Sequence, residues 1–375
     1  MGTPRRSWPV LVLVLPLALA CRSHAEEVKP APDPAAARTR GLEWLAKHAN
    51  EDGSFGRTHT VAVTGLACLA WLAASDEPWG EPSAPALLRA LEWLDGAQTD
   101  GVFTNQGHTW IHGQGFATLA LSEAYGRGLL CKTKPDLDLA RLRRTVLSAA
   151  RVIAESQSSS GGWWYTRDGG GQHEGSTTVC AVQALVSASN FGVPIDQAVL
   201  ERGFEYLKRC QNPDGGFDYM EGPGTESMKE GTAADVATLA LMRKFDYDVM
   251  VGGTKFLKKM GPAVVSAERF PYYGHFYACM GLRLFGEEMD AMPDAQAWSR
   301  DAVRDLLAWQ QLDGSWPLKS WMVSNGGETP AYATAFAALI LSVPDARLSV
   351  LRRTPPTLPA TAPREGAPAP AAPAR

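Results

Sequence analysis

The chain has 375 residues, and its 36 Lys and Arg against 40 Asp and Glu give a formal net charge of −4. The two signs are interspersed, so the charge gives no case for a nucleic-acid partner. Apart from Cys21, the cysteines are odd in number and widely spaced, which argues against a disulfide framework. We expect them to be mainly small buried hydrophobic residues; they are Cys68, Cys131, Cys180, Cys210 and Cys279.

The N-terminus has the features of an export signal. Arg5 and Arg6 precede an apolar run over residues 8–20, which is short for a membrane span and ends in small residues before Cys21. Residues 18–21 resemble the lipobox of bacterial lipoproteins, so residues 1–21 are predicted to be a signal peptide with lipidation at Cys21. Cleavage after Ala20 or Ala25 without lipidation is the alternative. Either reading predicts an exported protein of the bacterial periplasm or cell envelope, which a lipid on Cys21 would anchor to the membrane.

Residues 22–38 are rich in Ala, Pro and charged residues, which predicts a tether between the signal and the domain. Residues 353–375 are mostly Pro and Ala with hardly any large apolar residue. Such a segment cannot bury enough surface to offset its ordering entropy, so we expect a disordered tail. The folded domain is therefore predicted over residues 39–352.

A repeat runs through this domain. In its fullest copies, a basic residue, Gly or Ala, an apolar residue, Glu, an aromatic residue and Leu are followed by a Gly-x-aromatic ending. Gln often precedes that ending by four residues. The six equivalent positions are separated by 49, 59, 54, 50 and 49 residues; they are Ala49, Gln98, Gln157, Gln211, Gly261 and Gln310. A period this regular marks a repeat architecture.

Each repeat predicts a helical hairpin. Its first helix is amphipathic and its second is apolar on all sides and rich in Ala and Gly, so the second helix must be buried. Six outer helices around six inner helices satisfy this requirement. The predicted fold is all-α, an α6/α6 toroid, with an open solenoid of hairpins as the alternative.

The repeats resemble the QW motifs of squalene and oxidosqualene cyclases. Residues 272–279 resemble the segment of protein prenyltransferase β-subunits that carries a zinc-ligand His, and residues 305–344 resemble prenyltransferase/squalene-oxidase repeat proteins. The chain is thus similar to the terpenoid cyclase and protein prenyltransferase toroids. That resemblance implies the fold well and the chemistry poorly.

The chain departs from these families at their catalytic motifs. Residues 246–249 stop one Asp short of the Asp-x-Asp-Asp acid of terpene cyclases. The Asp-x-Cys zinc ligands of the prenyltransferases are absent, although His275 matches their His. The Gly-Cys-Gly-Glu-Gln motif of complement-like thioester domains is also missing.

Histidines gather at the starts of the inner helices. In a toroid these starts lie at one end of the ring, so a metal site, with zinc as its ion, is one hypothesis for His108, His112, His173 and His275. His108 and His112 are four residues apart, on one helical face. A metal-free polar site and purely structural hydrogen bonding are the two alternatives.

The candidate catalytic residues are His275, Asp235 and Glu174, because each lies at or within an inner helix. Asp235 is the costliest to bury without a partner, and a structural role for it remains equally open. Aromatic side chains on or beside the inner helices either line a ligand cavity or fill the centre. Those assigned to the lining are Trp110, Trp163, Trp164, Tyr272, Tyr273, Tyr277 and Tyr332.

Three functions follow from these features. The first is an exported toroid that binds an apolar, amphipathic or isoprenoid-type small molecule in its cavity, with transferase or cyclase-like activity as an extension. The second is a cell-envelope scaffold without catalysis that holds a protein partner. The third is a polysaccharide-active toroid, such as a lyase.

Overall fold

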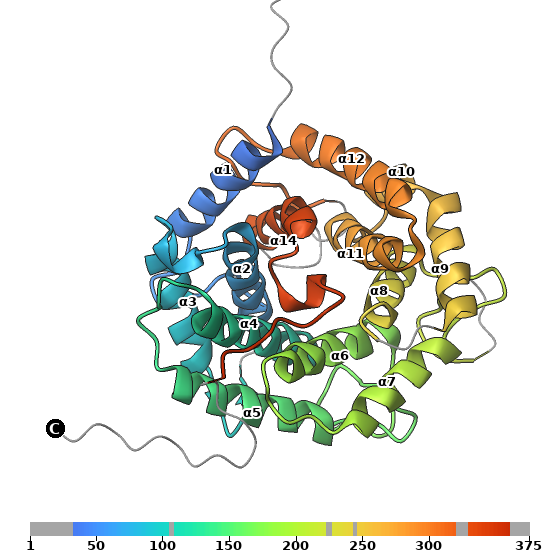
Figure 1. Cartoon of the computed structure of the whole chain (residues 1–375), viewed down its shortest axis with the longest axis horizontal. Coiled ribbons are helices and arrows are strands. Elements are labelled where there is room, and N and C mark those ends of the chain that lie inside the picture. The colour runs from blue at the N-terminus through green and yellow to red at the C-terminus, as the bar shows by residue number, and fades with distance from the viewer. Residues whose placement is uncertain (1–32, 105–108, 223–226, 243–245, 320–328, 361–375) are drawn as a thin grey trace, which may run out of the picture. The chain divides into compact units, whose positions relative to one another are not determined.

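The structure is a computed structural model that describes residues 33–104, 109–222, 227–242, 246–319 and 329–360. Within these residues it is mainly helical, and the helices alternate between an outer and an inner layer (Figure 1). The outer helices are α1 (Pro34–Lys47), α3 (Ala84–Gly96), α5 (Leu139–Glu155), α7 (Gln197–Arg209), α9 (Tyr247–Met260) and α12 (Met292–Trp309). The inner helices are α2 (Thr60–Ala74), α4 (Trp110–Leu130), α6 (Gly175–Asn190), α8 (Lys229–Leu239), α11 (Pro271–Met289) and α14 (Pro330–Ser342).

The remaining elements are short. They are α10 (Pro262–Ala267), the 3₁₀ turns η1 (Pro78–Gly80), η2 (Val343–Asp345) and η3 (Ser349–Leu351), and the antiparallel strands β1 (Gln98–Thr99) and β2 (Val102–Phe103). In this two-stranded ladder Gln98 lies opposite Phe103. No helix among the described residues is both long and apolar enough to cross a membrane.

The inner helices close into a ring. Each packs against the next in the order α2, α4, α6, α8, α11 and α14, and α14 packs back on α2 (Figure 1). Small residues allow this close packing: a β-carbon at Gly115 would lie 2.9 Å from the carbonyl oxygen of Cys180, and one at Gly281 would lie 2.9 Å from the amide of Ala237. The predicted toroid is confirmed, and the open solenoid is excluded.

In three of the repeats, the repeat glutamine joins its hairpin to the next outer helix. The side-chain amide of Gln157 donates to the carbonyls of Gly161 in its own loop and Val199 at the start of α7, both at 2.9 Å. Gln211 makes the same pair of bonds, to Gly215 and Val249. The repeat motif is therefore an inter-repeat connector, and its regular spacing follows from its structural role.

The glycine of each Gly-x-aromatic ending is required by its backbone. Gly161 has φ +97°, and a β-carbon there would lie 2.3 Å from the carbonyl oxygen of Arg202. The aromatic residue that follows it, Trp163, is fully buried between the helices of its hairpin, and its indole N–H donates to the carbonyl of Ile153 at 2.7 Å.

Both predicted domain boundaries shift outward. The carboxylate of Asp33 caps α1 by accepting from the amides of Ala35 and Ala36, so residues 34–38 are helix rather than tether. At the other end, Arg353 pairs with Glu288 at 2.5 Å and Leu358 packs against the core, so residues 353–360 contact the domain. The signal, Cys21, most of the tether and residues 361–375 lie outside the described residues.

Candidate functional site

A polar chain links the starts of α4 and α6. His112 Nε2 lies 3.3 Å from the hydroxyl of Ser176, and that hydroxyl donates to the Glu174 carboxylate at 2.7 Å. Because the serine proton is used on Glu174, the hydrogen-bond network assigns the proton of the imidazole to Nε2. Burial, and then the charge of His59, lower the pKa of His112 from 6.5 to about 4. His112 is therefore neutral at pH 7 and able to accept a hydrogen bond at Nδ1.

Glu174 is the N-cap of α6. Its carboxylate accepts from the amides of Ser176 at 2.8 Å and Thr177 at 2.7 Å, and its side chain is fully buried. Burial raises the pKa of Glu174 more than these donors lower it. The predicted catalytic residue Glu174 thus has a clear structural role, because its carboxylate accepts hydrogen bonds from the otherwise unpaired backbone amides of the first turn of α6.

Asp235 on α8 lies beside this cap. A β-carbon on Gly175, the first residue of α6, would be 3.7 Å from both Asp235 carboxylate oxygens. Asp235 is 2% exposed, and among the described residues its side chain has neither a hydrogen bond nor an ion pair. Burial, and then the charge of Glu174, hold the pKa of Asp235 well above its usual range. The pair therefore differs: Glu174 has donors for its charged form and Asp235 has none, so Asp235 is the carboxyl that retains its proton.

A tyrosine pair joins two loops near this site. The hydroxyls of Tyr165 and Tyr219 are 2.6 Å apart, and the ring of Tyr165 lies 5.7 Å from that of His112. Backbone bonds fix both loops, since the Tyr165 carbonyl accepts from Ile111 at 3.3 Å and the Tyr219 carbonyl accepts from Gly175 at 2.9 Å. His112, Tyr165, Glu174, Ser176, Tyr219 and Asp235 are called the mouth cluster below.

Aromatic rings occupy the interior of the ring of helices. The ring of Phe336 on α14 lies 5.0 Å from that of Tyr332, 5.7 Å from Phe276, 6.2 Å from Phe116 and 6.4 Å from Tyr273. Tyr273 and His112 are each only partly buried, so both side chains keep some accessible surface beside these rings.

A polar group lies among these rings. The Tyr277 hydroxyl donates to Gln183 Oε1 at 3.3 Å, and Gln183 Nε2 donates to the Thr238 hydroxyl at 2.9 Å. All three side chains are almost completely buried. The interior is therefore rich in aromatic rings and contains one buried polar network.

The histidines do not converge. His275 is fully buried, and its Nε2 lies 2.9 Å from the hydroxyl of Ser266 on α10, which donates to Asp305 on α12 at 2.6 Å. It joins the inner layer to the outer layer, and its aromatic neighbours are Trp298 and Trp309. The assignment of His275 to one site with His112 is therefore wrong, because the helix that carries it turns this side chain outward.

His173 has separate partners as well. Its Nε2 lies 3.6 Å from Glu221, and its ring packs against Tyr206 at 4.9 Å. His108 lies outside the described residues. Among the residues that the structure does describe, no group of three His, Cys, Asp or Glu side chains is placed to hold a metal ion. The metal site predicted from His108, His112, His173 and His275 thus gains no support.

Two of the seven predicted lining aromatics belong elsewhere. Trp163 is a hairpin core residue, as described above. Tyr272 donates its hydroxyl to the Pro317 carbonyl at 2.8 Å and packs on Trp309, at the side of α11 that faces the outer layer. Tyr273, Tyr277 and Tyr332 do belong to the interior cluster. Trp110 is 8% exposed at the start of α4, and Trp164 packs on Tyr165 at 5.0 Å.

The sequence reasoning missed Ser176, Tyr219 and Phe336. A signal for Tyr219 was present, because it stands two residues after Phe217 just as Tyr165 stands two residues after Trp163. Ser176 and Phe336 carry no comparable pattern. The incomplete acid motif is structural: Asp246 caps α9 and pairs with Lys208 at 2.9 Å. The five described cysteines are free and buried, and burial raises the pKa of each thiol.

These features define a closed α/α toroid with an aromatic interior and a buried polar cluster at one end. Residues 28–257, more than half of the chain, match the prenyltransferase alpha-alpha toroid domain, and the chain belongs to this family. A comparison with curated protein sequences finds no match.

Solved structures share the fold at low identity. The type II terpene cyclase MstE from Scytonema, as an apo variant, is 16% identical with a TM-score of 0.56, covering 84% of this chain and 97% of its own. A variant of MstE in complex with geranylgeranyl dihydroxybenzoate, its substrate, is 15% identical with a TM-score of 0.55, covering 85% and 97%. An inactive variant of an α-1,6-mannanase of Salegentibacter sp. HEL1_6, in complex with α-1,6-mannotetrose, is 10% identical with a TM-score of 0.60, covering 83% and 98%.

Proposed function

We propose that this toroid binds an apolar or amphipathic small molecule of isoprenoid type in its ring, with its polar end at the mouth cluster. The observation that carries the proposal is Asp235, a buried carboxyl without a partner among the described residues, close to an interior of aromatic rings. Leaving a buried polar group unpaired costs about 1–3 kcal/mol. Such a cost is expected where a ligand supplies the missing partner or where the carboxyl proton is used.

The surroundings of Asp235 suit transferase or cyclase-like acid chemistry. A protonated carboxyl beside an apolar space can donate a proton to an electron-rich ligand, and aromatic faces favour a cation that forms nearby. Tyr273, Tyr277 and Phe336 supply such faces. The substrate and product complexes of MstE with geranylgeranyl dihydroxybenzoate and merosterolic acid A support an isoprenoid ligand for this ring shape.

The mouth cluster supplies hydrogen bonds for the polar end of the ligand. Neutral His112 can accept at Nδ1, and the Tyr165–Tyr219 pair has one hydroxyl proton not used between the two oxygens. A hydroxyl or carbonyl group on the ligand fits these partners. Because the site has neutral rather than cationic groups, a diphosphate is a poor fit.

The test has two arms on the full chain. Organic extraction of freshly purified protein, followed by mass spectrometry, would detect a bound lipid, and quenching of tryptophan fluorescence by geranylgeraniol would measure affinity. The proposal expects saturable binding that weakens at least about tenfold in Tyr273→Ala, while Tyr247→Phe on the exposed outer surface leaves it unchanged. Absence of extractable lipid together with absence of saturable binding would remove the proposal.

A polysaccharide ligand is the second candidate. Two buried carboxyls near one another, Glu174 and Asp235, are the kind of pair that glycoside hydrolysis uses, and burial raises the pKa of both. The α-1,6-mannanase structure, which is similar in fold to this chain, contains a bound oligosaccharide. Saturable binding of α-1,6-manno-oligosaccharides, in place of geranylgeraniol, would favour this candidate. Failure of both ligands, with no effect of Asp235→Asn in the host, would favour the non-catalytic scaffold.

A further inference from the structure

The chain ends by crossing the far end of its own ring. After α14, residues 343–353 run across the centre of the inner ring, where Figure 1 draws them in red. They contact the C-terminal parts of several inner helices: Arg347 reaches α2, Ser349 reaches α4 and α6, and the Leu351 carbonyl accepts from Arg283 of α11 at 2.6 Å. Residues 343–353 are called the plug below.

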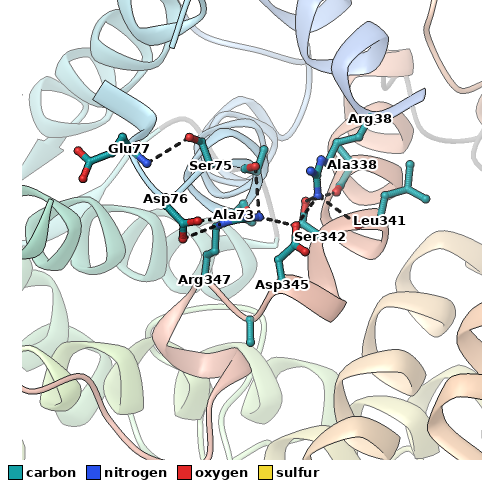
Figure 2. A network of polar contacts seen from close by, with 12 residues as sticks. Arg38, Ala73, Ser75, Asp76, Glu77, Ala338, Leu341, Ser342, Asp345 and Arg347 are labelled. Carbon is teal, nitrogen blue, oxygen red and sulfur yellow. Dashed lines mark hydrogen bonds and ion pairs between the residues drawn. The ribbon is translucent and has the colours of Figure 1, made fainter. Parts of the chain in front are cut away.

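Positive charge suits the plug to this position. The C-terminal ends of helices carry negative partial charge from unpaired carbonyls. The Arg347 guanidinium lies 3.4 and 3.3 Å from the carbonyls of Ala73 and Ala74 at the end of α2, and it pairs with Asp76 at 3.1 Å (Figure 2). Asp345 of the plug pairs with Arg38 of α1 at 2.7 Å, which ties the plug to the outer layer (Figure 2).

The plug seals the end with apolar side chains. Val343, Leu348, Val350 and Leu351 are each 1% exposed, although the plug itself is a surface segment after the last helix. All four belong to the same hydrophobic core cluster as the residues of the inner helices. They therefore form the floor of the interior, at the end opposite the mouth cluster.

One buried carboxylate holds the middle of the plug. Glu123 of α4 is fully buried and has no cationic partner within hydrogen-bond distance in the described part of the chain. Its oxygens accept from the Ser349 amide at 2.9 and 3.0 Å, from the Ser349 hydroxyl at 2.6 Å and from Ser187 at 2.9 Å. A buried carboxylate that depends on one plug residue for most of its donors makes docking of the plug a single cooperative step.

We infer that the plug is a latch: Glu123 holds Ser349 to keep the far end of the ring closed, and loss of this contact opens the interior from that end. The inference goes beyond the proposed function and does not depend on the identity of any ligand. It predicts that a ligand reaches the interior from the mouth cluster and that the plug segment, rather than the inner helices, is the part that moves when the floor opens.

The sharpest test replaces Ser349 with proline. Leu348 has φ −77° and ψ 148°, which suits a residue before proline, and Ser349 is the first residue of η3, where proline is favoured. Ser349→Pro therefore keeps the backbone conformation and removes the two donors that Ser349 offers to Glu123, its amide and its hydroxyl. Glu123→Met in the same chain then removes the stranded carboxylate, and replacing both partners by apolar groups is expected to relieve much of the penalty.

Two readouts on the full chain separate latch opening from unfolding. Hydrogen exchange of peptides from residues 343–353 reports undocking. Methyl methanethiosulfonate modification of Cys180, whose thiol lies near Tyr277 inside the ring, reports access to the interior, and Cys210 at the end of α7 reports global unfolding. Asp136→Asn, which removes an exposed carboxylate from the loop after α4, is the control.

The inference expects Ser349→Pro to speed exchange in the plug and modification of Cys180 by about tenfold or more. Modification of Cys210 should stay as in the parent chain, and Glu123→Met/Ser349→Pro should recover part of the protection. Unchanged plug exchange in a folded Ser349→Pro variant would overturn the latch. Equal acceleration at Cys180 and Cys210 in both variants would also overturn it, because the contact would then stabilise the whole fold.

Discussion

Gln310 of the last repeat donates its side-chain amide to the carbonyl of Ala37 in the first, at 2.8 Å, across 273 positions of sequence. The same amide also donates to the Gly314 carbonyl at 3.0 Å, and Arg40 donates to the Gln310 side-chain oxygen. Gln157 makes the equivalent contacts with Val199 and Arg202 inside the ring. The bond that joins neighbouring repeats is therefore the bond that closes the ring.

Replacing Gln310 with alanine should destabilise the fold. The change leaves two carbonyls without donors and loosens the seam between α12 and α1, so we expect a loss of about 1–3 kcal/mol in the free energy of unfolding. Urea denaturation followed by circular dichroism measures this loss. Gln311→Ala is the matched control, because the neighbouring side chain is exposed and bonds only the Trp309 carbonyl. Equal stability of the two variants would mean that the seam bond contributes nothing.

Gly161→Ala should cost more than a loop substitution normally does. Its β-carbon would lie 2.3 Å from the Arg202 carbonyl oxygen, and φ is +97°, so both sterics and backbone oppose it. We expect a loss of more than about 2 kcal/mol. Gly170→Ala provides the comparison, since φ there is also positive, at +57°, but nothing lies within 4 Å of the added carbon. Thermal denaturation measures the loss of stability in both variants, and the difference between the two losses gives the contribution of the steric clash.

The fold could be predicted from the sequence because its determinants are periodic. The Gln, Gly and aromatic positions recur in most of the hairpins, and the apolar inner helices leave a closed ring as the arrangement that buries them. The site was less predictable because it depends on rotation of individual helices. Placing a histidine near a helix start does not fix its direction, and the Ser266–Asp305 pair holds His275 on the outward side of α11.

Asp235 could be singled out because a carboxyl in an apolar helix is rare whatever the helix rotation. Glu174 was also named from the sequence, but its role as an N-cap could not be predicted, because that role depends on the exact start of α6. The plug was missed for another reason. Its residues Leu348, Val350 and Leu351 are ordinary apolar residues without a sequence pattern of their own. They are buried because they pack at one end of the ring, a tertiary contact that the local sequence does not predict.

Substitution of Cys21 tests the predicted anchor. If Cys21 is acylated, the mature chain begins at that residue and carries a diacylglycerol mass, and it partitions into the detergent phase of Triton X-114. We expect Cys21→Ser to abolish both properties. The folded domain should be unaffected, as judged by its circular dichroism. An aqueous chain cleaved after Ala20 or Ala25 in the parent protein would contradict the lipid anchor while leaving export in place.

His112 should make the protein sensitive to mild acid. Its pKa falls from 6.5 to about 4 on folding, so between these values the unfolded chain binds a proton that the folded chain does not. Stability should therefore be complete above about pH 6.5 and fall as the pH decreases toward 4, by up to about 3 kcal/mol from this residue. His112→Gln should reduce the slope of unfolding free energy against pH over this window. An identical slope in the parent and variant proteins would contradict burial of a neutral His112.

Asp235→Asn should stabilise the protein at neutral pH. Folding raises the pKa of this carboxyl, so as the pH rises from about 4 the unfolded chain loses its proton first and the parent protein becomes less stable. An amide has no proton to lose, so the variant should match the parent near pH 4 and exceed it by about 1–3 kcal/mol at pH 7. Urea titrations at the two pH values measure the difference. Asp246→Asn should behave in the opposite sense, because the pKa of Asp246 is lowered by Lys208 and its charged form is the one that stabilises. If Asp235→Asn is more stable but no longer binds the ligand, the destabilising effect of Asp235 is explained by its role in function. If the variant is less stable than the parent, the carboxylate has a structural partner.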